Sequence, residues 1–198
     1  MSDEGGRTFD VYKVMNSIDA VKYNMNSDMA LTLTDVEIMD IAEKTEDLYA
    51  DLEAAFKEKG ITVQINKETG EIAIDSSVIF GGDSAELSDA GKEMLKNYAE
   101  AYLSIISDEK YEGFIEKTMV EGHTAPVGGT IEEGMPLSKQ RADNVCNYCK
   151  DGAGVDLSGA VFEAVGYSCS RPIYNTDGSV NMDASRRVSF RFIISADA

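Results

Sequence analysis

The only histidine, His123, lies in the segment MVEGHTAPVGG (residues 119–129), where an apolar, strand-like stretch runs into a loop containing proline and glycine. A histidine in this position can act as a general base, bind a metal ion or form the rim of a binding pocket. General-base chemistry also needs a nucleophile or a positioned water, and an acid that orients the ring. The sequence contains no nucleophile elbow, metal-ligand pair or P-loop. We therefore expect a structural role for His123 and no enzymatic activity.

Cys146 and Cys149 form a C-x-x-C pattern, which is typical of redox and zinc sites. A redox pair lies at a helix N-terminus, where the helix dipole lowers the thiol pKa, whereas this pair falls late in a helical pattern. Zinc needs four ligands, and the remaining candidates, Cys169 and His123, are far away in sequence. The cysteines are therefore predicted to be core residues, with no metal and no cofactor.

The charge and the hydrophobicity pattern of the chain limit which partners it can bind and whether it can enter a membrane. The 198 residues carry a net charge of −18, with 36 acidic and 18 basic residues, so a nucleic acid would be repelled. No apolar stretch approaches the roughly 20 residues that span a bilayer, and the first residues lack the apolar core of a signal peptide. Two interpretations stay open: a soluble cytoplasmic protein, or a fragment whose membrane anchor lies upstream.

Three helices are predicted after residues 1–33, which have no clean period and are expected to be irregular or partly helical. Thr34 to Glu37 fits a capping box, and an apolar stripe then predicts a helix over about 35–59 that ends at Gly60. Ser88 caps a second helix, whose apolar face includes Tyr98 and Tyr102 and is expected to be core. A third helix is predicted over about 137–150, after a loop from His123 to Pro136.

Alternating residues predict a hairpin from 61–65 and 71–74, and further strands at 114–122, 161–167 and 186–194. One face of the last strand is expected in the core and the other toward water or a partner. From residue 61 the order is β-β-α-β-α-β-β. This order favours an α/β (α+β) sandwich, with a mixed sheet and helices packed on one face.

Five motifs occur in order along the second half of the chain, and together they resemble the OmpA-like domain. This peptidoglycan-binding module lies at the C-termini of outer-membrane protein A, the peptidoglycan-associated lipoprotein and motility protein B. The resemblance covers about residues 71–195 and implies an OmpA-like domain over 61–198, with residues 1–60 as a linker-like N-terminal extension. The motifs are VIFGGDSAELSDAG (78–91), VEGHT (120–124), LSKQRA (137–142), VGYSCSRPI (165–173) and SRRV (185–188).

The resemblance implies a non-covalent tether that captures the peptide stem of peptidoglycan at a diaminopimelate-type residue. The protein would then act in the extracytoplasmic cell envelope, joined to the membrane only through an anchor absent from this chain. The alternative is an OmpA-like fold that has lost wall binding. Such a domain would serve as a dimerisation or structural module of a motility protein B-like stator or envelope complex.

The family pattern also implies the site. Arg141 is expected to hold the ligand's carboxylate, because a guanidinium can grip it with two hydrogen bonds. Arg186 and Arg187 are expected as basic residues of the pocket. The alternative is that they are polar residues flanking an edge strand, and one of the two is expected to have only that role. Phe80 forms a wall with the glycines after it, and Ser138 starts a helix whose free amides suit an anion.

The sequence departs from the family pattern at three positions near this site. Ala125, after Thr124, replaces the aspartate that holds the ligand's ammonium, while Gly134 and Ser185 replace asparagines. The loss of the aspartate removes a counter-charge, so Glu132 or Glu133 is a hypothetical replacement carboxylate.

Overall fold

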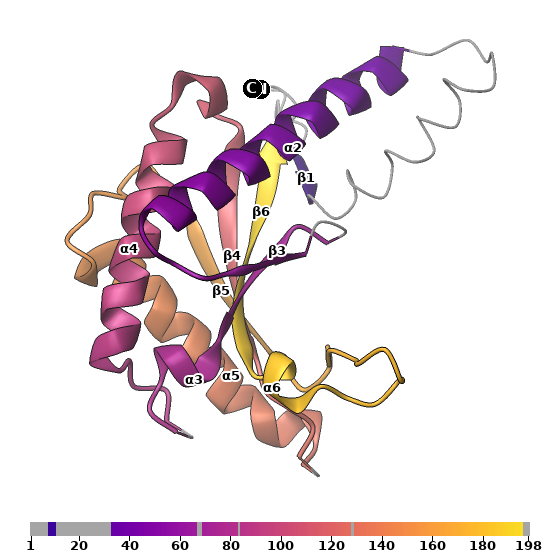
Figure 1. The fold of residues 1–198 in the computed structure, drawn as a ribbon, viewed down its shortest axis with the longest axis vertical. Coiled ribbons are helices and arrows are strands. Elements are labelled where there is room, and N and C mark those ends of the chain that lie inside the picture. The colour runs from indigo at the N-terminus through magenta and orange to yellow at the C-terminus, as the bar shows by residue number, and fades with distance from the viewer. Residues whose placement is uncertain (1–7, 11–32, 67–68, 83, 128, 196–198) are drawn as a thin grey trace, which may run out of the picture.

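The computed structural model describes residues 8–10, 33–66, 69–82, 84–127 and 129–195 (Figure 1). Over these residues the chain forms one mixed sheet, and its long helices pack on one face. The strands are β1 (Thr8–Asp10), β2 (Gln64–Asn66), β3 (Glu71–Asp75), β4 (Ile115–His123), β5 (Phe162–Ser168) and β6 (Arg187–Ser195). The helices are α2 (Leu33–Glu58), α3 (Ser76–Ile79), α4 (Asp89–Ile106), α5 (Ile131–Asn147) and α6 (Met182–Ser185), with a 3-10 helix at Glu109–Tyr111 and a π-helix at Tyr148–Gly152.

The sheet has the strand order β2-β3-β6-β4-β5, and β1 pairs with the end of β6. β4 and β5 are parallel and are joined through α5, whereas the other pairs are antiparallel. The predicted hairpin, the mixed sheet and the order of elements from residue 61 are therefore confirmed. β6 lies in the middle of the sheet, between β3 and β4 (Figure 1).

The prediction that one face of the last strand meets water or a partner is confirmed in part. β6 is a central strand, and on its face away from the helices Arg191, Ile193 and Ser195 are partly exposed, whereas the start of that face is buried. Arg187 and Ser189, which point away from the helices, are only 5% and 0% exposed. Glu121 on β4 lies opposite Ser189 in register, and Glu71 on β3 accepts a hydrogen bond from Arg187. The arginines therefore do not flank an edge strand.

An aromatic cluster joins the helices to the sheet. Tyr98 of α4 stacks on Phe190 of β6 with ring centroids 4.1 Å apart, and Tyr102 stacks on Phe192 at 5.9 Å. Phe56 of α2 stacks on Tyr98 at 5.3 Å, so α2 belongs to the same core. The prediction that Tyr98 and Tyr102 are core residues is confirmed. The domain boundary after residue 60 stays a prediction.

The start of α5 differs from the prediction. The helix begins at Ile131 rather than at 137, because Thr130 and Glu133 form a capping box. The Glu133 amide donates to the Thr130 hydroxyl over 3.3 Å, and the Thr130 amide donates to the Glu133 carboxylate over 2.9 Å. Pro136 lies inside the helix. Glu132, Glu133 and Gly134 therefore belong to helical turns and not to a loop.

At the N-terminal end, α2 matches the helix predicted for about 35–59. Most of the prediction for residues 1–33 lies outside the described residues, apart from β1, a strand that was not predicted. Within the described parts of the chain, no helix combines the length and the apolar character that crossing a membrane requires.

Candidate ligand-binding site

A cavity of about 230 Å³ lies where β4 ends and α5 begins. The chain leaves β4 at His123, passes through a short loop and enters α5 after Thr130. β5 runs parallel to β4 and ends beside it at Ser168, so the segment after β5 reaches the same place. The residues that line the cavity are Thr124, Ala125, Val127, Gly129, Thr130, Glu133, Gly134, Leu137, Arg141, Cys169 and Arg186.

Most of the predicted site residues meet in this cavity. Its lining includes Thr124, Ala125, Glu133, Gly134, Arg141 and Arg186. It does not include Phe80, Ser138, Arg187 or Glu132. Phe80, Ser138 and Arg187 each contact other residues of the fold, as the next paragraphs describe. Glu132 is exposed on α5 beside the cavity.

Arg141 is held in place by the segment before α4. Its Nε donates to the Ser84 carbonyl over 2.9 Å and its Nη2 donates to the Gly82 carbonyl over 2.8 Å. The guanidinium also lies 4.9 Å from the centre of the Phe80 ring. Phe80 is thus a support for Arg141 rather than a wall of the cavity. These bonds fix the guanidinium at the cavity wall. The expected two-bond grip of Arg141 on a ligand's carboxylate stays a prediction.

Ser138 lies behind the cavity wall and is fully buried. Its hydroxyl donates to the Met135 carbonyl over 3.0 Å and accepts from the Ser168 amide over the same distance. The prediction that the start of the third helix, at Ser138, meets an anion is therefore wrong. Ser168 itself has a φ of 51°, an uncommon value for a residue with a side chain, and this bend sends the chain toward the cavity.

At Gly134, α5 packs closely against the side chains of Ser168 and Thr124. A Cβ at this position would lie 2.2 Å from the Ser168 hydroxyl oxygen and 3.0 Å from the Thr124 hydroxyl oxygen. The asparagine that the family pattern places here does not fit this packing. The glycine and the bend at Ser168 are matched features of one wall.

Arg187 lies on the opposite face of the sheet from α5, where it pairs with Glu71. The Arg187 Nε is 2.6 Å from Glu71 Oε1, and Nη1 donates to the Arg171 carbonyl over 3.2 Å. Burial acts to raise the pKa of Glu71, but Arg187 outweighs it and the pKa lies below its usual range. The prediction that Arg187 is a basic residue of the pocket is wrong, because its charge is used within the fold.

Three charged residues give the cavity its electrostatic character. Arg141 is buried, whereas Arg186 is partly exposed at the rim, where its Nη1 pairs with Asp183 over 3.0 Å. Glu133 adds a carboxylate that accepts one amide hydrogen bond from Thr130. A carboxylate has about four acceptor positions, so Glu133 can also bind a ligand. Two cations, Arg141 and Arg186, and one anion, Glu133, therefore line the cavity.

His123 is buried beside Glu121 and Ser189, and these three residue types also form hydrolase triads. In a triad the serine and the carboxylate meet opposite nitrogens of the ring. Here both lie near Nε2: the Ser189 hydroxyl at 3.3 Å and Glu121 Oε2 at 3.7 Å. All three residues are at most 2% exposed, and none lines the cavity. The arrangement supports a structural cluster and not a relay of protons.

The cysteines divide into two groups. Cys146 and Cys149 are buried in the core, as predicted, and burial raises the pKa of both thiols, that of Cys149 to about 12. They are therefore neutral thiols at physiological pH. Cys169 departs from the prediction of a core residue, because it is half-buried and lines the cavity.

The motif VGYSCSRPI was recognised, but none of its residues was predicted for the site. The segment after β5 places Ser168 behind the cavity wall and Cys169 in its lining. A signal for it was available: two parallel strands joined by a helix end at the same edge of a sheet, and ligands bind beyond that edge.

The free energy of unfolding should fall as the pH drops below about 6.5. Burial lowers the pKa of His123 from 6.5, against the opposing effect of the Glu121 carboxylate. Its Nδ1 has no hydrogen-bond partner within the described residues, so a second ring proton would be poorly placed. The unfolded chain takes up this proton at a higher pH than the folded chain does, which destabilises the fold in acid.

Urea unfolding at several pH values between about 7.5 and 5.5 measures this effect, and His123→Gln serves as the comparison. The glutamine variant should show a flatter dependence on pH over this window, whatever its overall stability. Glu71 and Glu121, whose pKa values are lowered from 4.5, add their loss only below about pH 4.5. An equal pH dependence in both proteins would contradict the assignment to His123.

Comparison with known proteins decides the family. A family model described as the OmpA family matches residues 79–186, which is more than half of the chain. The Zorya protein ZorB of Escherichia coli is 30% identical over 159 residues, which cover 74% of this chain and 67% of that protein. The chain belongs to the OmpA family. The matched OmpA-family segment contains all the residues that line the cavity.

Solved structures share the fold of this OmpA-family chain. A putative MotB-like protein from Desulfovibrio vulgaris has a TM-score of 0.59 at 17% identity, over 81% of this chain and 96% of that one. The cell wall anchor of the T6SS from Pseudomonas aeruginosa has a TM-score of 0.51 at 20% identity, over 75% and 97%. At these identities the likeness establishes the OmpA-like architecture alone.

Proposed function

We propose that the chain binds the peptide stems of cell-wall peptidoglycan without catalysing a reaction, and that it tethers a membrane or envelope protein to the wall. A diaminopimelate-type residue of the stem enters the cavity beside Arg141, Arg186 and Glu133. The chain then acts in the extracytoplasmic envelope. Its membership of the OmpA family supports this proposal, as does its likeness to a structure described as a cell wall anchor.

The observation that carries the proposal is the presence of both charge signs in one small cavity. The end of a diaminopimelate side chain carries an ammonium and a carboxylate, and complementary charges fix the orientation of such a ligand. Ala125 is nearly buried and supplies no charge. Glu133 lines the cavity and Glu132 does not, so Glu133 is the carboxylate for the ammonium and the arginines attract the carboxylate.

Sedimentation with purified peptidoglycan sacculi tests the tether. The wild type should sediment with the sacculi, and Arg141→Ala or Arg186→Ala should weaken binding about tenfold, which corresponds to about 1.4 kcal/mol. Arg186 is the cleaner variant, because its side chain is partly exposed and holds no loop in place. Lys139→Ala is the matched control, a cation on α5 that pairs with Asp143 and does not line the cavity. A wild type that stays in the supernatant would refute the proposal.

The role of Glu133 has its own test. Glu133→Gln removes the charge but keeps the helix start, because glutamine also completes a capping box. Binding of sacculi should weaken about tenfold if this carboxylate meets the ligand's ammonium. Glu132→Gln, an exposed neighbour outside the cavity lining, should bind like the wild type. Unchanged affinity in both variants would exclude a replacement carboxylate.

A second candidate function is a dimerisation module that no longer binds the wall. Val127 and Ile131, 70% and 42% exposed beside the cavity, favour it because large apolar side chains on one surface promote association. Light scattering separates the two functions. A mass of twice 21.5 kDa, together with no binding to sacculi, would favour this second function.

A further inference from the structure

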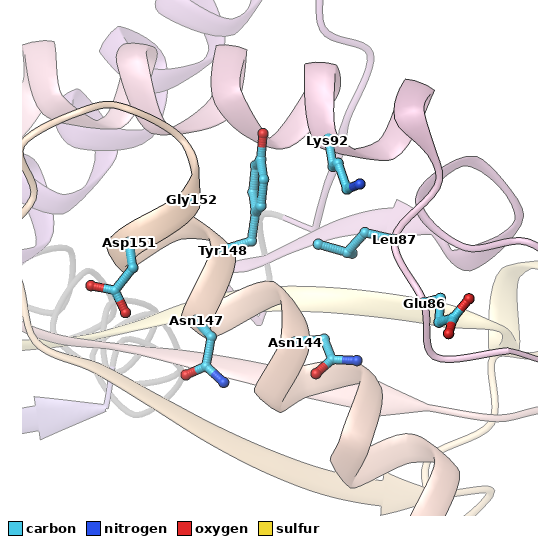
Figure 2. Close-up of a pocket in the computed structure, with 8 residues that line it drawn as sticks. All are labelled: Glu86, Leu87, Lys92, Asn144, Asn147, Tyr148, Asp151 and Gly152. Atoms are coloured by element: carbon cyan, nitrogen blue, oxygen red, sulfur yellow. The ribbon is translucent and has the colours of Figure 1, made fainter.

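A second hollow, of about 570 Å³, lies between the start of α4 and the end of α5 and is wide open to solvent. Leu87 and Lys92 border it on one side, and Tyr148 and Asp151 border it on the other (Figure 2). We call it the Tyr148 groove. It shares no lining residue with the cavity described above.

The ring of Tyr148 forms a fixed wall of this groove. A Cβ at Gly152 would lie 2.6 Å from Cδ2 of Tyr148, so the Gly152 backbone packs closely against the ring. Figure 2 shows the ring standing between Gly152 on one side and Leu87 and Lys92 on the other. The π-helix at Tyr148–Gly152 produces this placement, and such local widening of a helix is frequent at functional sites. The side of the ring away from Gly152 therefore faces the groove.

Neutral and acidic polar groups surround the ring. Asn147 and Asp151 are exposed, and the Asn144 side-chain amide is oriented by its bond to the Ala85 carbonyl, 2.8 Å away. Glu86 and Asp151 outnumber the single cation Lys92 in the lining. An anionic ligand such as a stem carboxylate or a nucleic acid is disfavoured by this charge.

We propose that the Tyr148 groove binds the sugar backbone of peptidoglycan, a neutral chain of N-acetylated hexoses. This inference rests on the proposed function. The apolar face of a hexose ring packs on an aromatic ring, which combines an apolar body with a polar tip. Hydroxyl and acetamido groups exchange hydrogen bonds with amides and carboxylates, which line the groove at Asn147 and Asp151. An open groove accommodates a stretch of a long polymer.

The two sites are spaced for one ligand. Arg141 of the cavity and Asn144 of the groove lie on α5, three residues or about 4.5 Å apart along the axis, and Tyr148 follows about 6 Å later. Arg141 holds the Gly82 and Ser84 carbonyls and Asn144 holds that of Ala85, so one loop separates the sites. An extended peptide of three residues spans about 10 Å, close to the distance along α5 from Arg141 to Tyr148. A stem in the cavity therefore places its sugar at the groove.

The test compares two probes by calorimetry. One is glycan strands stripped of their stem peptides by an amidase, with the lactyl carboxylates that the amidase frees then converted to amides so that the strands are neutral. The other is the free stem peptide. The wild type should bind both probes. Tyr148→Ala should weaken binding of the stripped strands about tenfold and leave binding of the stem peptide unchanged. Because Tyr148 also touches the core, Asn147→Ala/Asp151→Ala, which changes two exposed side chains, should give the same result. Glu116→Ala, exposed on β4 outside the groove, is the control.

The outcomes separate this inference from the proposed function. A wild type that binds sacculi and the stem peptide, but not the stripped strands, overturns the groove and leaves the tether standing. Stripped strands that bind the groove variants as well as they bind the wild type also overturn it. Strands that bind through Tyr148, with no affinity for the stem peptide, support the groove and refute the cavity as the stem site. Binding to the strands should change little with salt, because the ligand is neutral.

Discussion

Replacing Glu121 with glutamine is expected to lower the free energy of unfolding by about 3 kcal/mol, because it removes the charge of a buried carboxylate that pairs with Arg191 and Arg171. Glu121 is 2% exposed on β4, on the face of the sheet away from the helices. Its Oε1 accepts from Arg191 Nε over 3.1 Å, and its Oε2 lies 3.4 Å from Arg171 Nη1. One carboxylate thus balances two arginines from other parts of the chain.

The ionised form of Glu121 is the form that the fold needs. Burial acts to raise its pKa, but His123 and Arg191 outweigh burial, so the pKa lies below its usual range. A neutral amide keeps the shape of the side chain but cannot balance a guanidinium. The expected loss is therefore electrostatic and should be present at neutral pH.

Urea unfolding at pH 7 measures this loss, and Glu163→Gln is the matched control. Glu163 lies on β5 and pairs with Lys117 over 2.8 Å, but its side chain is 52% exposed. A surface ion pair adds little to stability, so this variant should unfold close to the wild type. Equal urea midpoints for the two variants would show that the ion pairs of Glu121 with Arg191 and Arg171 do not stabilise the sheet.

The fold could be predicted because its strongest signals are local. The alternation in β3 and β6, the apolar stripe of α4 and the cap at Ser88 each lie within one segment, and the Ser88 hydroxyl does accept from the Gly91 amide over 2.9 Å. The start of α5 was missed because Gly134 and Pro136 are typical of loops. The capping pair of Thr130 and Glu133 was readable in the sequence and overrides both.

The candidate site was predictable only in part, because its geometry depends on pairs that are distant in sequence. The order of motifs placed Thr124, Gly134 and Arg141 near one another, and they share the cavity. No local pattern shows that the Arg141 guanidinium is held by carbonyls 57 and 59 residues away, or that Arg187 pairs with a carboxylate 116 residues away. Partner choice for an arginine is set by the folded arrangement of strands and loops.

Replacing Gly122 with alanine is expected to destabilise the fold by about 3 kcal/mol or more, because the new methyl group meets backbone and not a movable side chain. A Cβ at Gly122 would lie 1.9 Å from the Ser138 carbonyl oxygen and 2.8 Å from its carbon. Gly166 of β5 faces α5 in the same way, with a Cβ position 2.7 Å from the Lys139 amide nitrogen. Paired glycines on two parallel strands thus let α5 lie directly on the sheet.

This close approach also sets the position of the cavity, because Leu137 and Arg141 extend from the same turns of α5. A methyl group at Gly122 must push the helix outward, so binding of sacculi should weaken along with stability. Urea unfolding and sedimentation of Gly122→Ala measure both effects. Gly159→Ala is the control, since a Cβ there meets nothing within 4 Å. If both variants unfold at the same urea concentration, the close packing of α5 on the sheet does not require a glycine at position 122.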